Sequence, residues 1–359
     1  MLGSKIDNLL LLKKENINIP DFIIVKHEDV ITKDITSYDL KNKTEKELIQ
    51  ISNKLKKELE ENIKIKLKNK LNYHLYSVRS SSTIEDGEHT SFAGQFDTYL
   101  NVTQEELNNK IIECFKSLYN VNVLEYMQKM NKDLSELKMN VIIQKMIDSE
   151  ISGVLFTCNP QGILNESVIV VSKGLGENVV QDKGETTSYY YNMTDKIYYY
   201  TGNQDLLSKE KIEELLELSE QIKSKLGNYL DIEFSIYKNK IYILQARKIT
   251  TIDDSNPLVL DNSNIVESYP GISLPLTCSF VNTVYTDVFK GVCRRVLKNE
   301  KELKELNHVF SNMVGNVNGR MYYKISNWYT IIKHLPMSEK IIPIWQEMLG
   351  VKNKNYNDK

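Results

Sequence analysis

Residues 78–102 read VRSSSTIEDGEHTSFAGQFDTYLNV, and this stretch decides the fold because small and charged residues stand where a core would need apolar ones. Arg79 offers a planar, permanently charged fork of hydrogen-bond donors that suits phosphate oxygens. The hydroxyl-bearing residues and Gly94 let backbone N–H groups come close to an anion. The segment therefore favours a polyphosphate-binding site. From the residues alone, a serine-rich turn beside a structural arginine fits equally well.

A second polar cluster is predicted on a hairpin over residues 231–247. A three-residue loop at 238–240 would put three apolar pairs on one face of the hairpin: Ile236 with Tyr242, Phe234 with Leu244, and Ile232 with Ala246. The other face then carries Glu233 opposite Gln245 and Asp231 opposite Arg247. A slip of one residue would break both faces, so the hydrophobic pattern selects the register that gathers the polar groups.

The pairing of Glu233 with Gln245 suggests a metal site. A carboxylate beside an amide oxygen suits Mg²⁺, a hard cation that takes few protein oxygens and fills its other positions with phosphate and water. The residues also fit a simpler arrangement, a solvated sheet face with a cross-strand ion pair between Asp231 and Arg247.

Both segments resemble the N-terminal nucleotide-binding domain of the family that contains pyruvate phosphate dikinase, phosphoenolpyruvate synthase and rifampicin phosphotransferase. Residues 231–250, DIEFSIYKNKIYILQARKIT, are similar to a family pattern that ends in Q-A-R-P-x-T, with Lys248 in place of the usual proline. The resemblance implies an α+β ATP-grasp fold of two subdomains, with ATP and Mg²⁺ as ligands.

The resemblance also implies roles for individual residues. Arg79 and Arg247 would be the catalytic phosphate contacts, and Glu233 and Gln245 the metal ligands. The implied nucleotide contacts are Lys5, Arg79, Gly94, Thr98, Gln144, Glu233, Gln245 and Arg247. Lys5 follows Gly3-Ser4 in a motif similar to the family's G-G-K, and Gln144 lies in a segment, VIIQKM, similar to the one joining the two halves of the cleft. Without the resemblance, Lys5 could be a solvated lysine and Gln144 a strand end.

Composition restricts the class of protein. The 359 residues carry a formal net charge of −2, which argues against nucleic acid or an anionic membrane as the main partner. The four cysteines form no C-x-x-C pair and suit reduced thiols. No apolar run approaches the ~18 residues that span a bilayer, and the N-terminus lacks a signal-peptide pattern. We therefore expect a cytoplasmic protein.

We expect four regions along the chain. Residues 1–140 and 141–250 would form the two ATP-grasp subdomains, and residues 251–263 a linker, because this stretch collects Asp, Asn, Ser and Pro257. Residues 264–359 resemble the beginning of the family's central domain, and we expect a partial, mainly helical and truncated segment there. Helices are predicted from about Thr44, from Thr103 and from near Ser208, because apolar positions spaced by three or four follow each residue. At Thr103 the Thr-x-x-Glu form of a capping box also marks the start.

Family members pass a phosphate from ATP to a swivelling histidine and then to an acceptor such as pyruvate or a drug hydroxyl. None of the five histidines stands in the T/S-x-H-x-A context of that carrier. We therefore expect a phosphotransferase domain that binds ATP but completes turnover only with a phosphohistidine domain, in the remainder of the chain or in a separate subunit. A rifampicin phosphotransferase-like antibiotic kinase, a non-catalytic ATP-binding regulatory module and an ATP-grasp carboxylate–amine ligase remain alternatives.

Overall fold

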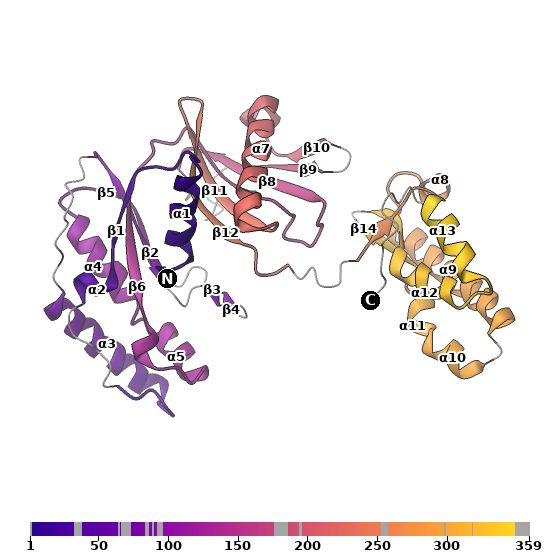
Figure 1. The fold of residues 1–359 in the computed structure, drawn as a ribbon, viewed down its shortest axis with the longest axis horizontal. Helices are drawn as coiled ribbons and strands as arrows, with labels where there is room; N and C mark the ends of the chain where they lie inside the picture. Colours follow the sequence, from indigo (N-terminus) through magenta and orange to yellow (C-terminus); the bar gives the residue numbers. More distant parts are fainter. Residues whose placement is uncertain are drawn as a thin grey trace. The chain divides into compact units, whose positions relative to one another are not determined.

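The computed structural model divides the chain into two compact units, Met1–Ile252 (unit 1) and Asp253–Lys359 (unit 2), shown in Figure 1. The structure describes residues 2–31, 38–63, 65, 73–82, 86–87, 90–91, 96–175, 186–193, 196–252, 258–297, 299–317 and 319–348. The division after Ile252 falls at the predicted linker. Within the described residues, no helix is both long enough and apolar enough to cross a membrane.

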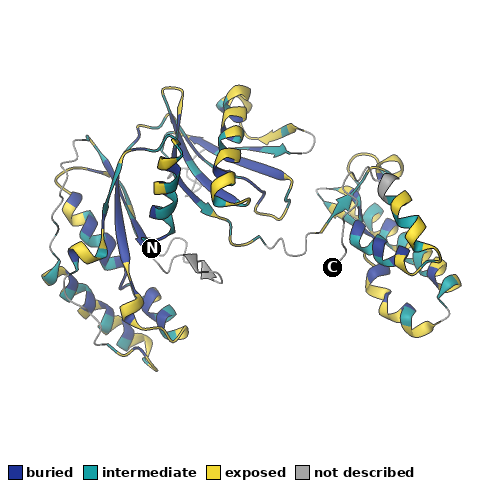
Figure 2. Ribbon diagram, in the orientation of Figure 1, coloured by how far each residue is buried: buried dark blue, intermediate teal, exposed yellow. Residues whose placement is uncertain are grey.

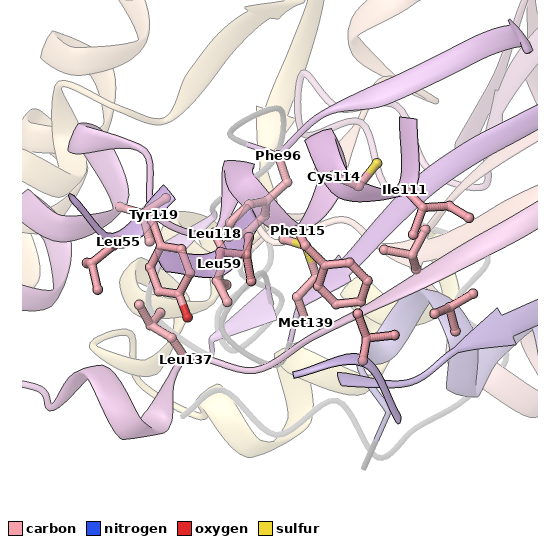
Figure 3. Packing of buried hydrophobic residues seen from close by; sticks show 14 of the residues in the cluster. Leu55, Leu59, Phe96, Ile111, Cys114, Phe115, Leu118, Tyr119, Leu137 and Met139 are labelled. Atoms are coloured by element: carbon pink, nitrogen blue, oxygen red, sulfur yellow. The ribbon is translucent and has the colours of Figure 1, made fainter. Parts of the chain in front are cut away.

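The first sheet of unit 1 has four antiparallel strands in the order β1-β6-β2-β5. Their bounds are β1 Phe22–Val25, β6 Met139–Lys145, β2 Tyr76–Ser82 and β5 Thr98–Val102. One face packs against helix α4, and α3 and α5 complete the same core, which Figure 3 shows from close by. These helices are α3 Glu45–Asn62, α4 Leu107–Ser117 and α5 Val121–Lys129. Alternate residues of β6, Met139, Val141 and Ile143, belong to this core, so alternate strand positions face these helices.

Capping boxes precede two of these helices, and the one at Thr103 was predicted. The Thr44 backbone N–H donates to Glu47 Oε2 at 2.8 Å and Glu47 N–H donates back to Thr44 Oγ1 at 3.4 Å, which is a complete capping box before α3. Thr103 and Glu106 make the same pair of bonds before α4. Both helix starts were predicted from the sequence and are confirmed.

The second sheet of unit 1 has six strands in the order β10-β9-β8-β7-β11-β12. The bounds are β7 Ile151–Phe156, β8 Glu166–Lys173, β9 Thr187–Asn192, β10 Ile197–Thr201, β11 Leu230–Tyr237 and β12 Lys240–Lys248. Helix α7 (Lys209–Leu226) covers one face, beginning after Ser208 and ending at Gly227, whose φ of 108° favours glycine. The strand β6 pairs in the first sheet, so the predicted subdomain boundary at 140/141 moves to the segment between β6 and β7.

Helix α1 (Ser4–Lys14) contacts strands of both sheets, and Figure 1 shows it between them. Ile6 and Leu9 pack with Ile142 of the first sheet, whereas Leu12 joins the core of the second. Asn8 Nδ2 donates to the Ala246 carbonyl of β12 at 2.8 Å. The sequence analysis placed this helix in the first subdomain alone. In the structure it packs against both subdomains. The smaller elements of unit 1 are α2 His27–Val30, β3 Asp86–Gly87, β4 Thr90–Ser91 and the 3₁₀ turns Leu134–Glu136 and Gln204–Leu206.

Unit 2 is mainly helical, as predicted, but it also contains a three-stranded sheet, β13-β15-β14. Its helices are α8 Ile265–Ser268, α9 Pro275–Val296, α10 Glu300–Glu305, α11 Asn307–Phe310, α12 Ile325–Lys333 and α13 Ser338–Met348. Its strands are β13 Leu260–Asp261, β14 Val314–Val317 and β15 Arg320–Lys324. Because β13 pairs with β15, the last part of the predicted linker belongs to this unit.

Candidate functional site

Residues 78–82, the first part of the stretch 78–102, lie in β2. This strand has neighbours on both sides in the first sheet, and Figure 2 shows it as buried. The register sets Arg79 beside Ile142 of β6 and Thr98 of β5, so these residues share the face opposite the helical core. Gln144 lies on this face too, opposite Ser77. Of the described polar residues in β2, Arg79 and Ser81 therefore lie on the face toward α1, whereas Ser80 and Ser82 lie on the opposite face with Val78.

The serines after Arg79 are structural. The hydroxyls of Ser80, Ser81 and Ser82 are buried and donate to the carbonyls of Asp97, Leu2 and Lys138, at 3.1, 3.4 and 3.1 Å. Buried hydroxyls need such partners, because an unpaired one costs free energy. Residues 80–82 are therefore strand residues whose hydroxyls tie β2 to neighbouring segments, and the alternative of a serine-rich turn is wrong for them.

The hairpin of β11 and β12 forms the predicted polar pairs, but its turn and its strand register differ from those predicted. The turn has two residues, Lys238 and Asn239, both with positive φ, so Tyr237 pairs with Lys240 rather than Ile241. A β-bulge at Leu244 then shifts the register by one residue. Beyond the bulge Glu233 pairs with Gln245, and Asp231 with Arg247, as predicted.

The bulge also changes which side chains of β12 are buried. Ile241 and Ile243 lie in the core of the second sheet with Ala246, whereas Tyr242 and Leu244 are half-buried. The predicted pairs of Ile236 with Tyr242 and Phe234 with Leu244 are therefore wrong, and that of Ile232 with Ala246 is confirmed. The extra residue reverses the alternation of sides along the strand. Gln245 therefore faces the same side as Glu233 and Asp231, away from α7.

Arg79 joins the two sheets at this point. Its Nη2 donates to Glu233 Oε2 at 2.7 Å and to Gln245 Oε1 at 2.9 Å, and its Nη1 donates to the carbonyl of Leu244 at 3.2 Å. The side chains of Arg79 and Glu233 are 12% and 29% exposed, so the ion pair is largely shielded from water. The bulge carbonyl of Leu244 is the functional group that the sequence analysis missed. The change of apolar spacing from Ile241–Ile243 to Ala246 was the available signal.

Arg247 pairs with the carboxylate next to this site. Its Nε and Nη2 both donate to Asp231 Oδ2, at 2.9 and 2.7 Å. Burial raises the pKa of Asp231, and the nearby charge of Glu233 acts in the same direction, against the opposing effect of Arg247. Among the described residues, Asp231 Oδ1 is buried and finds no hydrogen-bond partner. Burying this carboxylate therefore costs free energy, and the pairing with Arg247 offsets only part of that cost.

Lys5 reaches the site from the first turn of α1. Its Nζ donates to the Ser80 carbonyl at 3.3 Å, and its charge acts on Glu233. Gly3, just before the helix, has φ 97°, and a Cβ there would lie 2.5 Å from Ser81 Oγ. A glycine is thus required for α1 to approach β2, and this close approach positions Lys5.

Three cations surround the two carboxylates of the site. Burial opposes ionisation of Glu233, but the charges of Arg79, Arg247 and Lys5 outweigh burial, so the pKa of Glu233 is lowered. Glu233 is therefore ionised at neutral pH. The five groups Lys5, Arg79, Arg247, Asp231 and Glu233 leave an excess of positive charge, which favours an anion between the sheets.

The other predicted contacts are only partly gathered here. Gln144 is 2% exposed, and within the described residues its Nε2 has no hydrogen-bond partner. Thr98 is exposed beside Arg79, and Gly94 lies outside the described residues. The structure therefore brings Lys5, Arg79, Glu233, Gln245 and Arg247 together and leaves Gln144 and Thr98 on the adjoining sheet face.

The residues fit a magnesium ion by their chemistry. Glu233 Oε2 and Gln245 Oε1 both lie within hydrogen-bond distance of one atom, Arg79 Nη2, so the two oxygens already converge on a cationic group. Hard oxygens of this kind are the ligands that Mg²⁺ prefers. No group of three or more His, Cys, Asp or Glu side chains gathers among the described residues. The pair would therefore leave most positions of the ion to phosphate and water.

A family model described as "Pyruvate phosphate dikinase, AMP/ATP-binding domain" matches residues 1–263. The chain belongs to this family. It thus carries a dikinase-type ATP-binding domain, and the two-subdomain α+β architecture of unit 1 is its ATP-grasp fold. A solved D-alanine–D-alanine ligase from Helicobacter pylori overlaps 70% of this chain and 57% of its own, with 12% identity and a TM-score of 0.32, a level of similarity that carries no further argument.

Three curated relatives of this AMP/ATP-binding domain are two proteins named as phosphotransferases and one named as a probable phosphoenolpyruvate synthase. The uncharacterized phosphotransferase YvkC of Bacillus subtilis is 33% identical over 283 residues, covering 70% of this chain and 34% of that protein. A probable phosphoenolpyruvate synthase of Archaeoglobus fulgidus is 34% identical, covering 49% and 27%. Rifampicin phosphotransferase of Bacillus subtilis is 32% identical, covering 50% and 24%. The chain spans about a third or less of these relatives.

Proposed function

We propose that unit 1 binds ATP with Mg²⁺ between its two sheets and supplies the ATP-dependent step of a phosphotransferase. The phosphate would pass to a histidine on a phosphohistidine domain, in the remainder of the chain or in a separate subunit, and then to an acceptor such as pyruvate or a drug hydroxyl. The observation that carries the proposal is the convergence of Lys5, Arg79 and Arg247 on the oxygen pair of Glu233 and Gln245. The family match and the names of the relatives support it.

Each residue has a role in this proposal. Lys5, Arg79 and Arg247 neutralise phosphate charge, and Glu233 and Gln245 hold the metal. When bound, Mg²⁺ would polarise the phosphates and offset the charge that builds up during transfer. Phosphoryl transfer requires mainly positioning and electrostatic stabilisation, which a set of fixed cations on two rigid sheets provides. Gln144, Thr98 and Gly94 would complete the nucleotide contacts.

The alternatives receive less support. A carboxylate–amine ligase is not favoured, because the matching family is a dikinase family. Neither a non-catalytic regulatory module nor an antibiotic kinase is favoured by any contact described above. A cytoplasmic location is supported by the four free thiols and by ATP as the ligand. The near-neutral charge of the chain agrees with the absence of nucleic acid and membrane from the proposed partners.

Calorimetric titration with ATP, with and without Mg²⁺, tests the binding step. Lys5→Ala should weaken Mg-ATP binding at least about tenfold, because a hydrogen bond to a charged group contributes roughly 1.5–3 kcal/mol. Lys13→Ala is the matched control, since Lys13 lies on the same helix but pairs at 3.9 Å with the exposed Asp21. Equal affinities for the two variants, or no Mg-ATP binding by the unaltered chain, would reject the proposal.

Product analysis tests the transfer step. Incubation of the chain with Mg-ATP and a phosphohistidine domain of the family should release AMP, transfer one phosphate to the added histidine and, with water, release the other as inorganic phosphate. ATP labelled in the transferred phosphate should then label that histidine. ATP binding without any transfer to the added domain would favour a non-catalytic module, and release of ADP with an acyl phosphate would favour a ligase.

A further inference from the structure

We propose that Arg79 is the resident cation of the metal site when no nucleotide is bound, and that Mg²⁺ replaces its guanidinium only together with ATP. The inference rests on the proposed function and adds an order of events to it. Free metal is excluded by Arg79, whereas ATP draws the arginine onto its phosphates and opens the oxygen pair to the ion.

The geometry of Arg79 supports this exchange. One nitrogen, Nη2, lies 2.7 Å from Glu233 Oε2 and 2.9 Å from Gln245 Oε1, the same two oxygens that would hold the metal. Magnesium bonds oxygen at about 2.0–2.1 Å in a demanding octahedral arrangement. An ion at that distance from both oxygens would occupy the space and the lone pairs that the guanidinium now uses. The arginine and the metal therefore compete for one position.

The charges around the site make the competition one-sided without ATP. Arg79, Arg247 and Lys5 together already outweigh the burial of Glu233 and hold its pKa below the ordinary value. A divalent ion added to this group would meet three cations in a partly buried space, where charges are screened weakly. ATP changes the balance because its phosphates are polyanionic and accept the fork of donors on an arginine.

Arg79 is also held in a way that permits release. Its Nη1 and Nη2 are bonded, but its Nε is buried and has no hydrogen-bond partner among the described residues. A buried donor without a partner costs free energy, so the present position of the guanidinium is not its best possible one. A move onto phosphate oxygens can satisfy this third donor. The acceptors it leaves, Glu233 and Gln245, become free for the metal.

The test measures metal binding without nucleotide, with Mn²⁺ as the probe and free Mn²⁺ followed by electron paramagnetic resonance. The unaltered chain should bind Mn²⁺ weakly. Arg79→Gln should bind Mn²⁺ at least tenfold more tightly and Mn-ATP at least tenfold more weakly, two changes of opposite sign from one substitution. Arg320→Gln, at an exposed arginine of unit 2, is the control and should change neither. Unchanged or weaker Mn²⁺ binding by a folded Arg79→Gln protein would overturn the inference.

Two further measurements locate the effect. The gain of Mn²⁺ affinity should disappear in Arg79→Gln combined with Glu233→Gln, and a gain that persists would place the metal elsewhere and overturn the inference. If Arg79→Gln does not fold, the unaltered chain still decides, because ATP should raise Mn²⁺ affinity at least tenfold and Mn²⁺ should raise ATP affinity by the same factor. Tight ATP binding with no such coupling rejects only the exchange, whereas no ATP binding at all rejects the proposed function itself.

Discussion

Units 1 and 2 differ in what they bury. Every buried polar or charged side chain in the described part of the chain, tyrosines aside, belongs to unit 1, among them Gln144, Asp231 and Gln245. Unit 2 shows the opposite feature, because α9 exposes large apolar side chains to solvent. These exposed residues are Leu276, Phe280, Val284, Val288 and Val292. Burying a polar group costs stability unless it is hydrogen-bonded, and such costs are expected at functional sites. The unusual feature of unit 1 is therefore its buried polar residues, and that of unit 2 is its exposed apolar surface.

The largest difference in stability loss between the two units should come from substituting one arginine in each. Arg247→Ala leaves the carboxylate of Asp231 buried without its cation, and we expect unit 1 to lose roughly 3 kcal/mol of unfolding free energy. Arg294→Ala in unit 2 removes a pair with Glu300 at 3.8 Å in which both side chains are more than half exposed, and should cost less than about 1 kcal/mol. Urea unfolding followed by circular dichroism measures both. Equal losses would show that the polarity buried in unit 1 carries no special cost.

Neighbouring residues of α9 provide the next test. Val281 is fully buried and Phe280 is 62% exposed. We expect Val281→Ala to cost roughly 2 kcal/mol through lost burial and a cavity, and Phe280→Ala to cost less than about 0.5 kcal/mol. Both tryptophans, Trp328 and Trp345, belong to unit 2, so their fluorescence reports its unfolding selectively. A greater loss from the larger Phe280 would mean that this side chain is covered in solution.

A smaller effect concerns the pH dependence of unit 1. The pKa of Glu233 is lowered from 4.5 in the folded protein, so its ionised form stabilises the fold above the unfolded value. That contribution is lost as the pH falls through and below 4.5. Glu233→Gln should therefore be less stable than the unaltered chain at neutral pH, with the gap closing in acid. Circular dichroism melts between pH 3 and 7 would measure the gap, and a gap that stays constant would contradict the prediction.

The neighbouring Asp231 gives a control of opposite sign. Burial raises its pKa, so its contribution favours the fold in acid and declines as the pH rises through the folded pKa. The free energy of unfolding of Asp231→Asn, relative to that of the unaltered chain, should therefore be most favourable at neutral pH and least favourable in acid. The tryptophan fluorescence of unit 2 should respond to pH in the same way in all three proteins.

The hydrophobic pattern predicted much of this architecture. It predicted the helices that begin after Thr44, Thr103 and Ser208, and it paired Glu233 with Gln245 and Asp231 with Arg247 as observed. The resemblance of two segments to one family then predicted ATP, which composition alone could not. The first of these segments pointed to Arg79 and the separate Gly3-Ser4-Lys5 motif to Lys5, and the structure brings both to the same site.

The sequence could not predict the contacts that depend on backbone detail. A two-residue turn and a bulge at Leu244 cancel one another in register, so the far pairs were right although the near pairs were wrong. The roles of Ser80 to Ser82 depend on carbonyls from distant segments, which no local pattern encodes. The convergence of Arg79 on the oxygens of the other sheet likewise arises only when both sheets have folded.

The smallest predicted effect compares left-handed residues of the two units. Unit 1 places Asn239 at φ 60°, whereas unit 2 places Met337 at φ 59° just before α13, with 70% of its surface exposed. Asparagine tolerates this conformation, but a longer side chain is strained there and glycine is not. Met337→Gly should therefore raise the stability of unit 2 by roughly 0.5–1 kcal/mol, seen as a higher urea midpoint in tryptophan fluorescence, and Asn239→Gly should change unit 1 by only a few tenths. Met337→Ala keeps the Cβ and should not stabilise. A gain from Met337→Ala equal to that from Met337→Gly would assign the effect to the lost apolar side chain instead of the backbone.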